Sequence, residues 1–289
     1  MGGTGVIDRF LGTFTQYIDS GFGLVRGDVH ALAAVLIGID VTLAALFWIL
    51  APDEDVLARL IKKTLYIGAF AFIIGNYNSL AQIIYNSFAG LGIEAGGGTM
   101  SAAQLLQPGR LAQVGIDAGK PILTAITGLM GFASFFENFV QIVILLIAWL
   151  ILVLSFFIMA IQLFVCLIEF KLTTLAGFVL VPFGLFGRTA FLAEKVLGNV
   201  VASGVKVLVL AVIVGIGSTI FSQFTSGFNN PPTIDDALTV ILAAMSLLGL
   251  TIFGPGIANG LIAGGPQLGA GAAVGTGLVV GGVGVAGAA

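Results

Sequence analysis

Few charged side chains and almost no histidine or cysteine occur in this sequence. Charged residues make up 9% of the 289 positions, whereas soluble domains carry about 25%. The single histidine, His30, cannot build a multi-histidine metal site, and the single cysteine, Cys166, cannot form an internal disulfide. With 11 basic against 14 acidic residues, the net charge of −3 argues against a nucleic-acid clamp that works by bulk electrostatics.

Apolar residues dominate the chain instead. They make up 58% of it, another 42 residues are glycine, and the mean hydropathy is +1.13. Too little polar surface remains to cover such a chain in water, which excludes an ordinary soluble enzyme. The sequence also lacks the HExxH, GxSxG, Walker A and dinucleotide-binding motifs. We therefore predict an integral membrane protein that is not an enzyme and uses no cofactor and no metal.

Five apolar segments approach or exceed the roughly 20 residues that a helix needs to cross a bilayer. The third is free of charge for 31 residues between Glu137 and Glu169. As a straight helix it would be about 46 Å long, so it must tilt or project beyond a hydrocarbon core of about 30 Å. The stretch 172–187 is short and contains Pro182, which indicates a re-entrant or interfacial hairpin. The expected spans are 31–50, 64–92, 138–168, 207–224 and 237–253, the last extendable to Ile262.

The remaining segments complete an all-α membrane fold with about five transmembrane helices. Apolar residues at helical spacing before the first span predict an N-terminal amphipathic helix. Residues 96–120 are expected to be a loop with one or two short helical turns, broken at Pro108–Gly109. The Gly/Ala-rich C-terminal tail is compatible with a closely packed helix or with a flexible tail. The predicted division is 1–30 amphipathic segment, 31–93 two spans, 94–137 central periplasmic loop, 138–262 three spans with the hairpin, and 263–289 tail.

The distribution of basic residues predicts the orientation, because Lys and Arg gather in cytoplasmic loops. Two basic regions follow the first and third spans, at 51–63 and 169–195. The loop before the last span has no basic residue and ends in Asp235 and Asp236. This asymmetry predicts an N-terminus outside the cytoplasm and a C-terminus inside it. The basic residues concerned are Arg59, Lys62, Lys63, Lys171, Arg188 and Lys195.

Polar residues inside the first two spans are candidates for a functional or packing role. Asp40 stands at the middle of the first span, where a carboxylate costs about 2.5–3.5 kcal/mol on insertion scales. It is expected to face an aqueous path or a partner, although a tolerated structural carboxylate is the alternative. Asn78 and Gln82 share one helical face with Tyr85. That face fits a pore lining or interhelical hydrogen bonding.

The third span carries a polar-to-small stripe at intervals of seven residues. Such a repeat drifts by only about 20° per heptad on an ideal helix, so the stripe stays on one slowly winding side. It could form the wall of a conduit or the seam of a helix bundle. The fourth span has a small-residue face that permits close helix approach. The stripe comprises Gln141, Ala148, Ser155, Gln162 and Glu169, and the small face comprises Ala211, Gly215, Ser218 and Ser222.

The block from Leu180 to Phe221 combines a Pro-Phe step, a Gly-Arg-Thr turn, a Glu-Lys pair and a glycine-bearing apolar helix. In these features, and in the run IDRFLGTFTQYIDSGF before the first span, the chain resembles the TrbL family. Members are polytopic inner-membrane subunits of conjugative type IV secretion systems, related to the polytopic VirB channel proteins. The likeness extends over roughly residues 5–262. The residues that carry it most clearly are Pro182, Phe183, Gly187, Arg188, Thr189, Glu194 and Lys195.

The resemblance implies a channel or stalk-base subunit of the bacterial inner membrane that supports transfer of relaxase-linked single-stranded DNA and pilus biogenesis. It implies a homo-oligomer, a pentameric ring, which contacts other inner-membrane, stalk and pilus subunits and membrane lipid. Relaxase and DNA would be its cargo.

Two other functions remain open. One is a secondary transporter of a small solute that uses Asp40 as its coupling carboxylate, although the halves of the chain show no internal repeat. The other is a structural membrane scaffold with no conduit.

Overall fold

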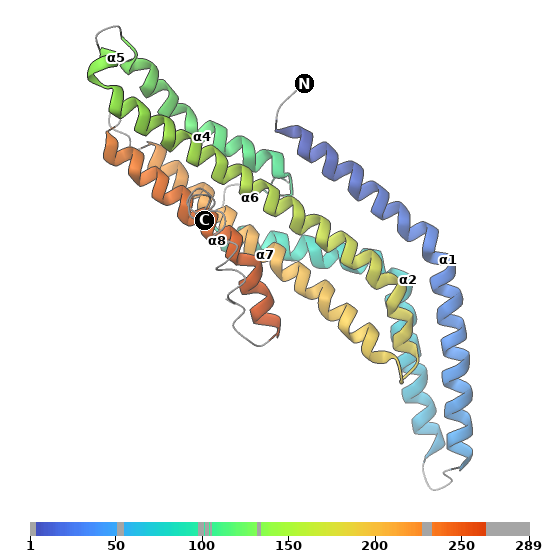
Figure 1. The fold of residues 1–289 in the computed structure, drawn as a ribbon. Helices are drawn as coiled ribbons and strands as arrows, with labels where there is room; N and C mark the ends of the chain where they lie inside the picture. Colours follow the sequence, from blue (N-terminus) through green and yellow to red (C-terminus); the bar gives the residue numbers. More distant parts are fainter. Residues whose placement is uncertain are drawn as a thin grey trace, which may run out of the picture. The chain divides into compact units, whose positions relative to one another are not determined.

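The structure is a computed structural model that describes residues 4–50, 55–97, 106–131, 134–226 and 233–263, together with Ser101 and Gln104. All regular elements in these ranges are helices, and no strand occurs among them (Figure 1). The predicted all-α fold is confirmed. The elements are α1 (Gly5–Leu50), α2 (Val56–Ala95), α4 (Pro108–Leu129), α5 (Ser134–Glu137), α6 (Phe139–Leu180), the 3-10 helix η1 (Val181–Leu185), α7 (Ala190–Ser226) and α8 (Ile234–Ala263).

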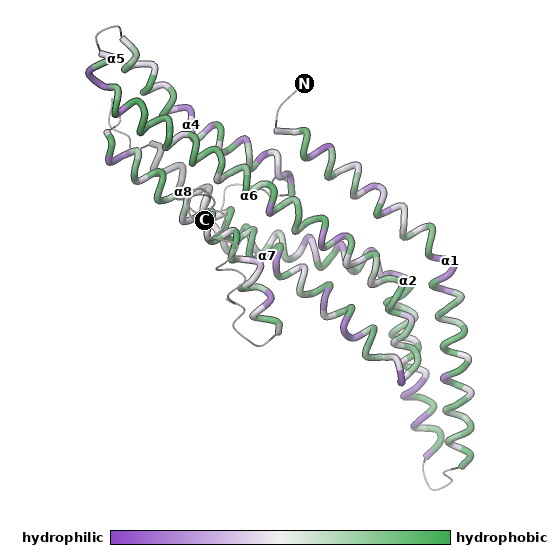
Figure 2. The backbone as a smooth tube through the Cα atoms, in the orientation of Figure 1, coloured by the Kyte–Doolittle hydropathy of each residue, from purple (hydrophilic) through white to green (hydrophobic). Residues whose placement is uncertain are grey.

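Four helices in the described part of the chain are long and apolar enough to cross a membrane. This number is close to the predicted count of about five. The expected second span lies in α2, where Asn76, Asn78 and Gln82 interrupt the apolar run. Figure 2 shows the long helices coloured mainly as hydrophobic, with hydrophilic residues interspersed. The four candidates are Gly5–Leu50, Phe139–Leu185, Ala190–Gly217 and Ile234–Ile262.

The chain forms two compact units, and their boundaries fall inside helices. The first, which we name the α1–α2 unit, contains residues 11–87 and 168–204. The second, named the α4–α8 unit, contains residues 1–10, 88–167 and 205–289. Each unit therefore combines segments that are far apart in the sequence.

Aromatic and branched aliphatic side chains form the core of the α1–α2 unit. Phe178 of α6 lies against two aromatic rings, with its centroid 5.5 Å from that of Phe22 and 5.7 Å from that of Tyr77. Tyr85 of α2 contacts Phe170 at 4.8 Å between centroids. Such ring pairs add packing energy beyond the apolar area that they bury. The buried members of this core are Ile18, Phe22, Val29, Ala33, Leu36, Ile74, Tyr77, Ala81, Phe170, Phe178, Val181, Leu185, Val196 and Val200.

Glycines bring the helices of the α4–α8 unit into close contact. A Cβ on Gly119 of α4 would lie 2.8 Å from a ring carbon of Trp149 on α6. One on Gly217 of α7 would lie 2.6 Å from Leu247 on α8. Separations below 3.0 Å require a neighbour to move. The missing side chains thus allow the helix backbones to approach, as small residues do in membrane proteins.

The prediction of a loop over 96–120 is wrong from Pro108 onward. A 22-residue helix, α4, begins there and runs to Leu129. Pro108 occupies the first turn, where its missing N–H group needs no helical partner, so proline starts this helix rather than breaking it. Gly115 and Gly119, which lower helix propensity, serve the close packing against α6. Part of 96–107 lies outside the described residues.

Two other boundaries differ from those expected. Residues 172–180 continue α6 instead of forming a separate hairpin arm, and the turn is confined to 181–189. The local cause is Pro182, which enters a 3-10 turn where the α-helix stops. The N-terminal amphipathic segment and the first span form one continuous helix, α1. The expected tail from 264 onward, and the side chains of Ser218 and Ser222, lie outside the described part of the chain.

Candidate functional site

The residues that carry the family resemblance form the connection between α6 and α7, which we call the signature turn (residues 181–189). Pro182 and Gly184 are buried within η1, whereas Gly187 and Arg188 are exposed after it. The hydroxyl group of Thr189 donates to the carbonyl oxygens of Phe183, at 2.8 Å, and Phe186, at 3.2 Å. The same two carbonyl oxygens also accept the backbone N–H groups of Phe186 and Thr189, so the Thr189 hydroxyl group adds a second donor that tightens the turn.

Two aromatic residues of helix α2 contact the signature turn at Gly184. The hydroxyl group of Tyr66 donates a hydrogen bond of 2.8 Å to the carbonyl oxygen of Gly184. The ring of Phe70 packs so closely on Gly184 that it occupies the place of a side chain. Only glycine fits here without a shift of Phe70. The conformation of the turn is thus fixed by contacts with two aromatic residues of α2. The sequence analysis did not identify either of them.

The charged residues after the turn lie on the surface. Glu194 and Lys195 are exposed on the first turns of α7. The Lys195 ammonium group stands 5.6 Å from the centroid of the Phe191 ring, a cation–π distance. Together with Gly187 and Arg188, they form the exposed part of the signature block.

Asp40, the candidate in the first span, forms an ion pair with Lys63 of α2. Its side chain is 9% exposed, whereas that of Lys63 is 25% exposed. The pair joins residues on the two sides of the α1–α2 connection, as expected for helices that pack antiparallel. The partner of Asp40 is therefore a residue of the same chain. The carboxylate can serve to hold α1 against α2.

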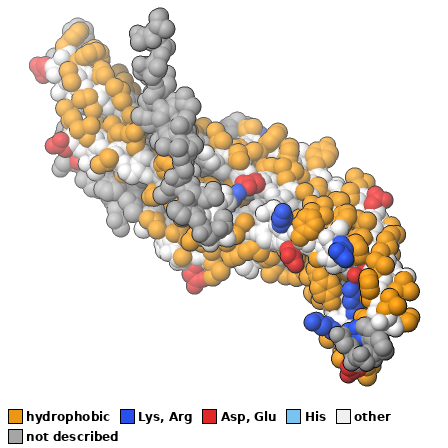
Figure 3. Space-filling model, turned by 60° about the horizontal axis from the view of Figure 1, so that its bottom comes forward, with side chains coloured by type: hydrophobic (Ala, Val, Ile, Leu, Met, Phe, Trp, Pro, Cys, Tyr) orange, Lys and Arg blue, Asp and Glu red, His pale blue; other side chains and the backbone are white. Residues whose placement is uncertain are grey.

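The first basic region lies close to one residue of the signature turn in the α1–α2 unit. A pocket of about 380 Å³ is lined by basic residues of α2 and by Gly187 of the signature turn. Basic side chains are visible among apolar ones in Figure 3. The residues lining this pocket are Ala44, Trp48, Arg59, Lys62, Lys63, Tyr66 and Gly187.

The polar face of α2 begins at a kink. Asn76 has non-helical backbone angles (φ −116°, ψ 15°), and its side-chain amide donates to the carbonyl oxygen of Phe72 at 3.0 Å. Asn78 lines a cavity of about 320 Å³ together with Asp19 and Arg26 of α1. Gln82 is exposed one turn further on. These predicted residues thus line a polar cavity and the adjoining surface, and Asp40 does not line that cavity.

An ion pair that the sequence analysis missed stands beside the same cavity. The Lys171 ammonium group of α6 lies 2.8 Å from the Asp19 carboxylate of α1. Both residues lie outside the predicted spans, and no local pattern joins positions 152 residues apart. Only the packing of α1 on α6 shows that they meet.

The stripe on α6 is buried at Ala148 and Ser155 and half-buried at its other three positions. Ser155 is 1% exposed, and its hydroxyl group donates to the carbonyl oxygen of Ile151 at 2.7 Å within the same helix. Gln141, Gln162 and Glu169 are half-buried. The first two and Ser155 belong to the α4–α8 unit, whereas Glu169 belongs to the α1–α2 unit. Burial of Ser155 favours the seam interpretation for this position.

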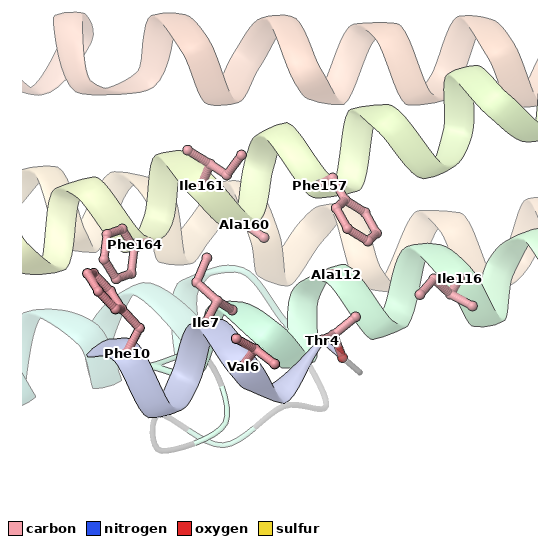
Figure 4. Close-up of a pocket in the computed structure, with 10 residues that line it drawn as sticks. All are labelled: Thr4, Val6, Ile7, Phe10, Ala112, Ile116, Phe157, Ala160, Ile161 and Phe164. Carbon is pink, nitrogen blue, oxygen red and sulfur yellow. The ribbon is translucent and has the colours of Figure 1, made fainter. Parts of the chain in front are cut away.

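The start of α1 packs on α4 and α6 in the α4–α8 unit. The Asp8 carboxylate accepts a 2.7 Å hydrogen bond from the backbone N–H of Gly109. Asp8 thereby caps α4, whose own cap residue Gln107 makes no side-chain cap bond. Beside this contact lies an apolar cavity of about 770 Å³ (Figure 4). It is lined by Thr4, Val6, Ile7, Phe10, Ala112, Ile116, Phe157, Ala160, Ile161 and Phe164.

The comparisons with known proteins match the region that contains the signature turn and the Asp40–Lys63 pair. A family model described as TrbL/VirB6 plasmid conjugal transfer protein matches residues 37–254. The conjugal transfer protein TrbL of Rhizobium radiobacter is 26% identical over 247 residues, which cover 83% of this chain and 58% of that protein. The probable conjugal transfer protein TrbL of Sinorhizobium fredii (strain NBRC 101917 / NGR234) is 25% identical over 221 residues, or 76% and 52%.

The chain therefore spans a little more than half the length of these curated relatives. The matched segment nevertheless extends from the first span through the signature turn and into α8. It makes up well over half of the chain, and it contains the Leu180–Phe221 block that carries the resemblance most clearly, although not the run at residues 7–22. The chain belongs to the TrbL/VirB6 family of plasmid conjugal transfer proteins.

Proposed function

We propose that the chain is an inner-membrane subunit of a conjugative type IV secretion system, at the channel or at the base of its stalk. In this role it supports transfer of relaxase-linked single-stranded DNA and pilus biogenesis. The observation that carries the proposal is the family match over residues 37–254. The four long apolar helices support the membrane location. The subunit acts by assembly and not by catalysis.

The orientation proposed has a periplasmic N-terminus and a cytoplasmic C-terminus. It is supported by the basic residues Lys62 and Lys63 of α2, which line one pocket with Gly187 of the signature turn. Arg188, the neighbour of Gly187, thus lies in sequence next to a residue that shares a pocket with Lys62 and Lys63, which agrees with the positive-inside rule if this end of the α1–α2 unit is cytoplasmic.

A homo-oligomer, a ring of five copies, is part of the proposal, with other inner-membrane, stalk and pilus subunits as partners. Helix α6 supports a geometry in which subunits project from the bilayer. It has 42 residues, which as a straight helix would measure about 63 Å against a core of about 30 Å.

The first experiment is conjugative plasmid transfer from a donor that lacks this gene, with and without the gene supplied in trans. We expect transfer to be lost in the deletion and restored by complementation. Transfer that is unaffected by the deletion would contradict the proposed function. Pilus production scored in the same strains separates the two parts of the proposal.

The polar residues on α6 are proposed to contribute to subunit packing or to the conduit wall. Because Ser155 is buried inside the α4–α8 unit, a leucine there would disturb the subunit itself. The sharper test is Gln162→Leu, with Ile161→Leu at an adjacent exposed position as the control. Reduced transfer or a smaller oligomer with only the first variant supports the role. The candidates for this role are Asp40, Asn78, Gln82, Gln141, Ser155, Gln162 and Glu169.

The alternative, a secondary transporter that uses Asp40, makes a different prediction. It requires proton-dependent solute uptake that Asp40→Asn abolishes. The ion pair with Lys63 supplies a structural reason for this carboxylate instead. We therefore expect Asp40→Asn to change the stability of the protein. We also expect cells that carry the wild-type gene to show no proton-dependent solute uptake.

A further inference from the structure

The apolar cavity of about 770 Å³ is lined by the first turns of α1 together with α4 and α6, all within the α4–α8 unit (Figure 4). At one end of it the rings of Phe10 and Phe164 pack with their centroids 5.7 Å apart, and at the other end lie Ile116 and Phe157. Between these ends the lining includes Ala112 and Ala160, which are buried. Their short side chains leave open the space that the larger residues surround.

The wall that α1 contributes is attached to α4 at two points. One is the hydrogen bond from the backbone N–H of Gly109 to the Asp8 carboxylate. A side chain at Gly109 would overlap that carboxylate, so glycine allows the close approach. At the second point the Thr4 hydroxyl group donates to the side-chain oxygen of Gln113 at 3.3 Å. The cavity is therefore bounded by contacts within this unit.

The lining of the cavity does not suit water. Among the described residues that line it, Thr4 alone has a polar side chain. A buried water molecule needs two to four polar partners, whereas apolar cavities stay dry and take up apolar molecules. The volume of about 770 Å³ also falls in the range of about 300–1,000 Å³ that is usual for ligand sites. The ligand that fits this site is therefore apolar where it meets the cavity.

The size of the cavity argues against a single side chain of another subunit as its occupant. A cavity of about 150 Å³ accommodates one benzene ring, so this one has room for about five such rings. One inserted side chain would leave most of the lining without contacts, and empty apolar space forfeits dispersion energy. A long, flexible hydrocarbon chain can follow the cavity between its two aromatic ends.

Polar residues run along α4 beside the cavity. Gln113, Asp117 and Lys120 recur on one helical face and are exposed, and the last two form an ion pair of 2.7 Å. Helix α4 is not among the four apolar helices, whereas α6 is. An amphipathic helix of this kind lies at the boundary between the hydrocarbon core and the headgroups. A ligand here thus meets apolar surface in the cavity and a polar face next to it.

We propose that the cavity binds one acyl chain of a membrane phospholipid, whose headgroup lies beside the polar face of α4. The acyl chain matches the apolar lining and the length of the cavity, and the headgroup matches the exposed polar residues Gln113, Asp117 and Lys120. In this complex the lipid fills space that the helices leave open and joins the start of α1 to α6.

Tryptophan fluorescence gives a local test, because the chain has only two tryptophans, Trp48 and Trp149. In the full-length protein both are replaced by phenylalanine, and Phe157→Trp places one reporter at the cavity. A second protein carries Leu150→Trp instead, an exposed position of the same helix that does not line the cavity. Both are kept in micelles of a rigid sterol-based detergent, which offers no alkyl chain. Dibrominated phosphatidylcholine is then added as the quencher.

We expect the binding constant of the lipid relative to the detergent to be about ten-fold higher at position 157 than at position 150. About ten additional carbon–carbon contacts in the cavity would supply this difference. Equal constants at the two positions would overturn the proposal.

Three variants make the test specific. Ala112→Leu with Ala160→Leu fills the cavity and should lower the constant at position 157 to that at position 150. Ala34→Leu with Ala176→Leu adds the same side chains at exposed positions of the α1–α2 unit and should leave the constant unchanged. Val6→Gln makes an exposed part of the lining polar and should lower the constant several-fold, even if the filled variant does not fold. An unchanged constant in Val6→Gln, or in a filled variant that folds, would contradict the assignment.

Oligomer size in the same micelles tests the other occupant, a second copy of this chain. We expect the filled variant and its control to keep the oligomer size of the starting protein. A smaller oligomer in the filled variant, together with equal quenching at the two reporters, would assign the cavity to a subunit contact and overturn the lipid assignment. The measurement needs no DNA transfer, so its failure is distinguishable from failure of the proposed function.

Discussion

The two units of the molecule stabilise their helix contacts in different ways. In the α1–α2 unit, polar groups meet across helices, as in the Asp40–Lys63 pair and the hydrogen bond from Tyr66 to Gly184. In the α4–α8 unit, glycines such as Gly115 let helices approach until backbone and side chain are in contact. Both units are apolar, so hydropathy alone does not reveal whether polar pairs or closely packed glycines join the helices. The division is not complete, since Gly184 packs closely on Phe70 in the first unit and Asp8 accepts a hydrogen bond from Gly109 in the second. Among the described residues, however, the ion pairs between helices lie in the α1–α2 unit.

The largest expected effect comes from Lys63→Met, which leaves the Asp40 carboxylate buried without its partner. We expect the free energy of unfolding to fall by about 3 kcal/mol, at the lower end for broken buried pairs because Lys63 is partly exposed. Asp40→Asn should cost less, since the longer lysine side chain can reach water. Denaturant or thermal unfolding in detergent measures both.

The double variant Asp40→Asn with Lys63→Met is the control for this pair. It should recover most of the loss, because no buried charge remains. If the two single losses simply add, the ion pair does not couple α1 to α2, and the contrast between the units disappears.

The next effect tests space in the α4–α8 unit. A Cβ on Gly115 would overlap Phe156 of α6, so Gly115→Leu should lower the free energy of unfolding by about 1–3 kcal/mol. Gly128 lies in the same helix with nothing within 4 Å of its Cβ position. Gly128→Leu should therefore leave stability unchanged or raise it slightly through helix propensity. Equal losses of unfolding free energy in the two variants would show that the contact between Gly115 and Phe156 does not determine the effect.

A smaller effect concerns the signature turn. Tyr66→Phe removes the donor to the Gly184 carbonyl oxygen and should cost about 1 kcal/mol. Tyr17→Phe makes the same change at a position that is 77% exposed and should have no measurable effect. Unfolding midpoints of the two variants decide the matter. If Tyr66→Phe leaves the unfolding midpoint unchanged, the hydrogen bond from Tyr66 does not stabilise the signature turn.

The smallest effect is a pH dependence in α4, which is not among the four apolar helices. A hydrogen bond from Lys120, followed by one from Gln113, lowers the pKa of Asp117 below its ordinary value of 3.8. A lowered pKa in the folded state means stability that is present above pH 3.8 and is lost as the pH falls through the folded value. For so exposed a pair it amounts to a few tenths of a kcal/mol.

Carbon NMR titration of the Asp117 carboxyl group checks this directly. The midpoint should lie below 3.8 and return toward that value in Lys120→Gln. A wild-type midpoint at or above 3.8 would show that the ion pair does not persist in solution.

Much of the fold followed from composition and periodicity. The long charge-free run before Glu169 predicted an overlong helix, and α6 has 42 residues. The prediction of a loop around Pro108 is wrong because it rests on proline and glycine as helix breakers. Their role depends on context, since Pro108 starts α4 and Gly115 faces Phe156. Asp40 pairs with Lys63 of α2, and no local pattern in the sequence identifies that lysine as its partner.

The sequence by itself determined the membrane character, the helical class and the family, because these depend on composition, period and local motifs. Only the tertiary structure decided which groups meet, such as Asp19 with Lys171 and Tyr66 with Gly184. The physical reason is that a contact between helices depends on their relative direction, register and separation. No single helix carries that information, and it arises only when several apolar faces pack together.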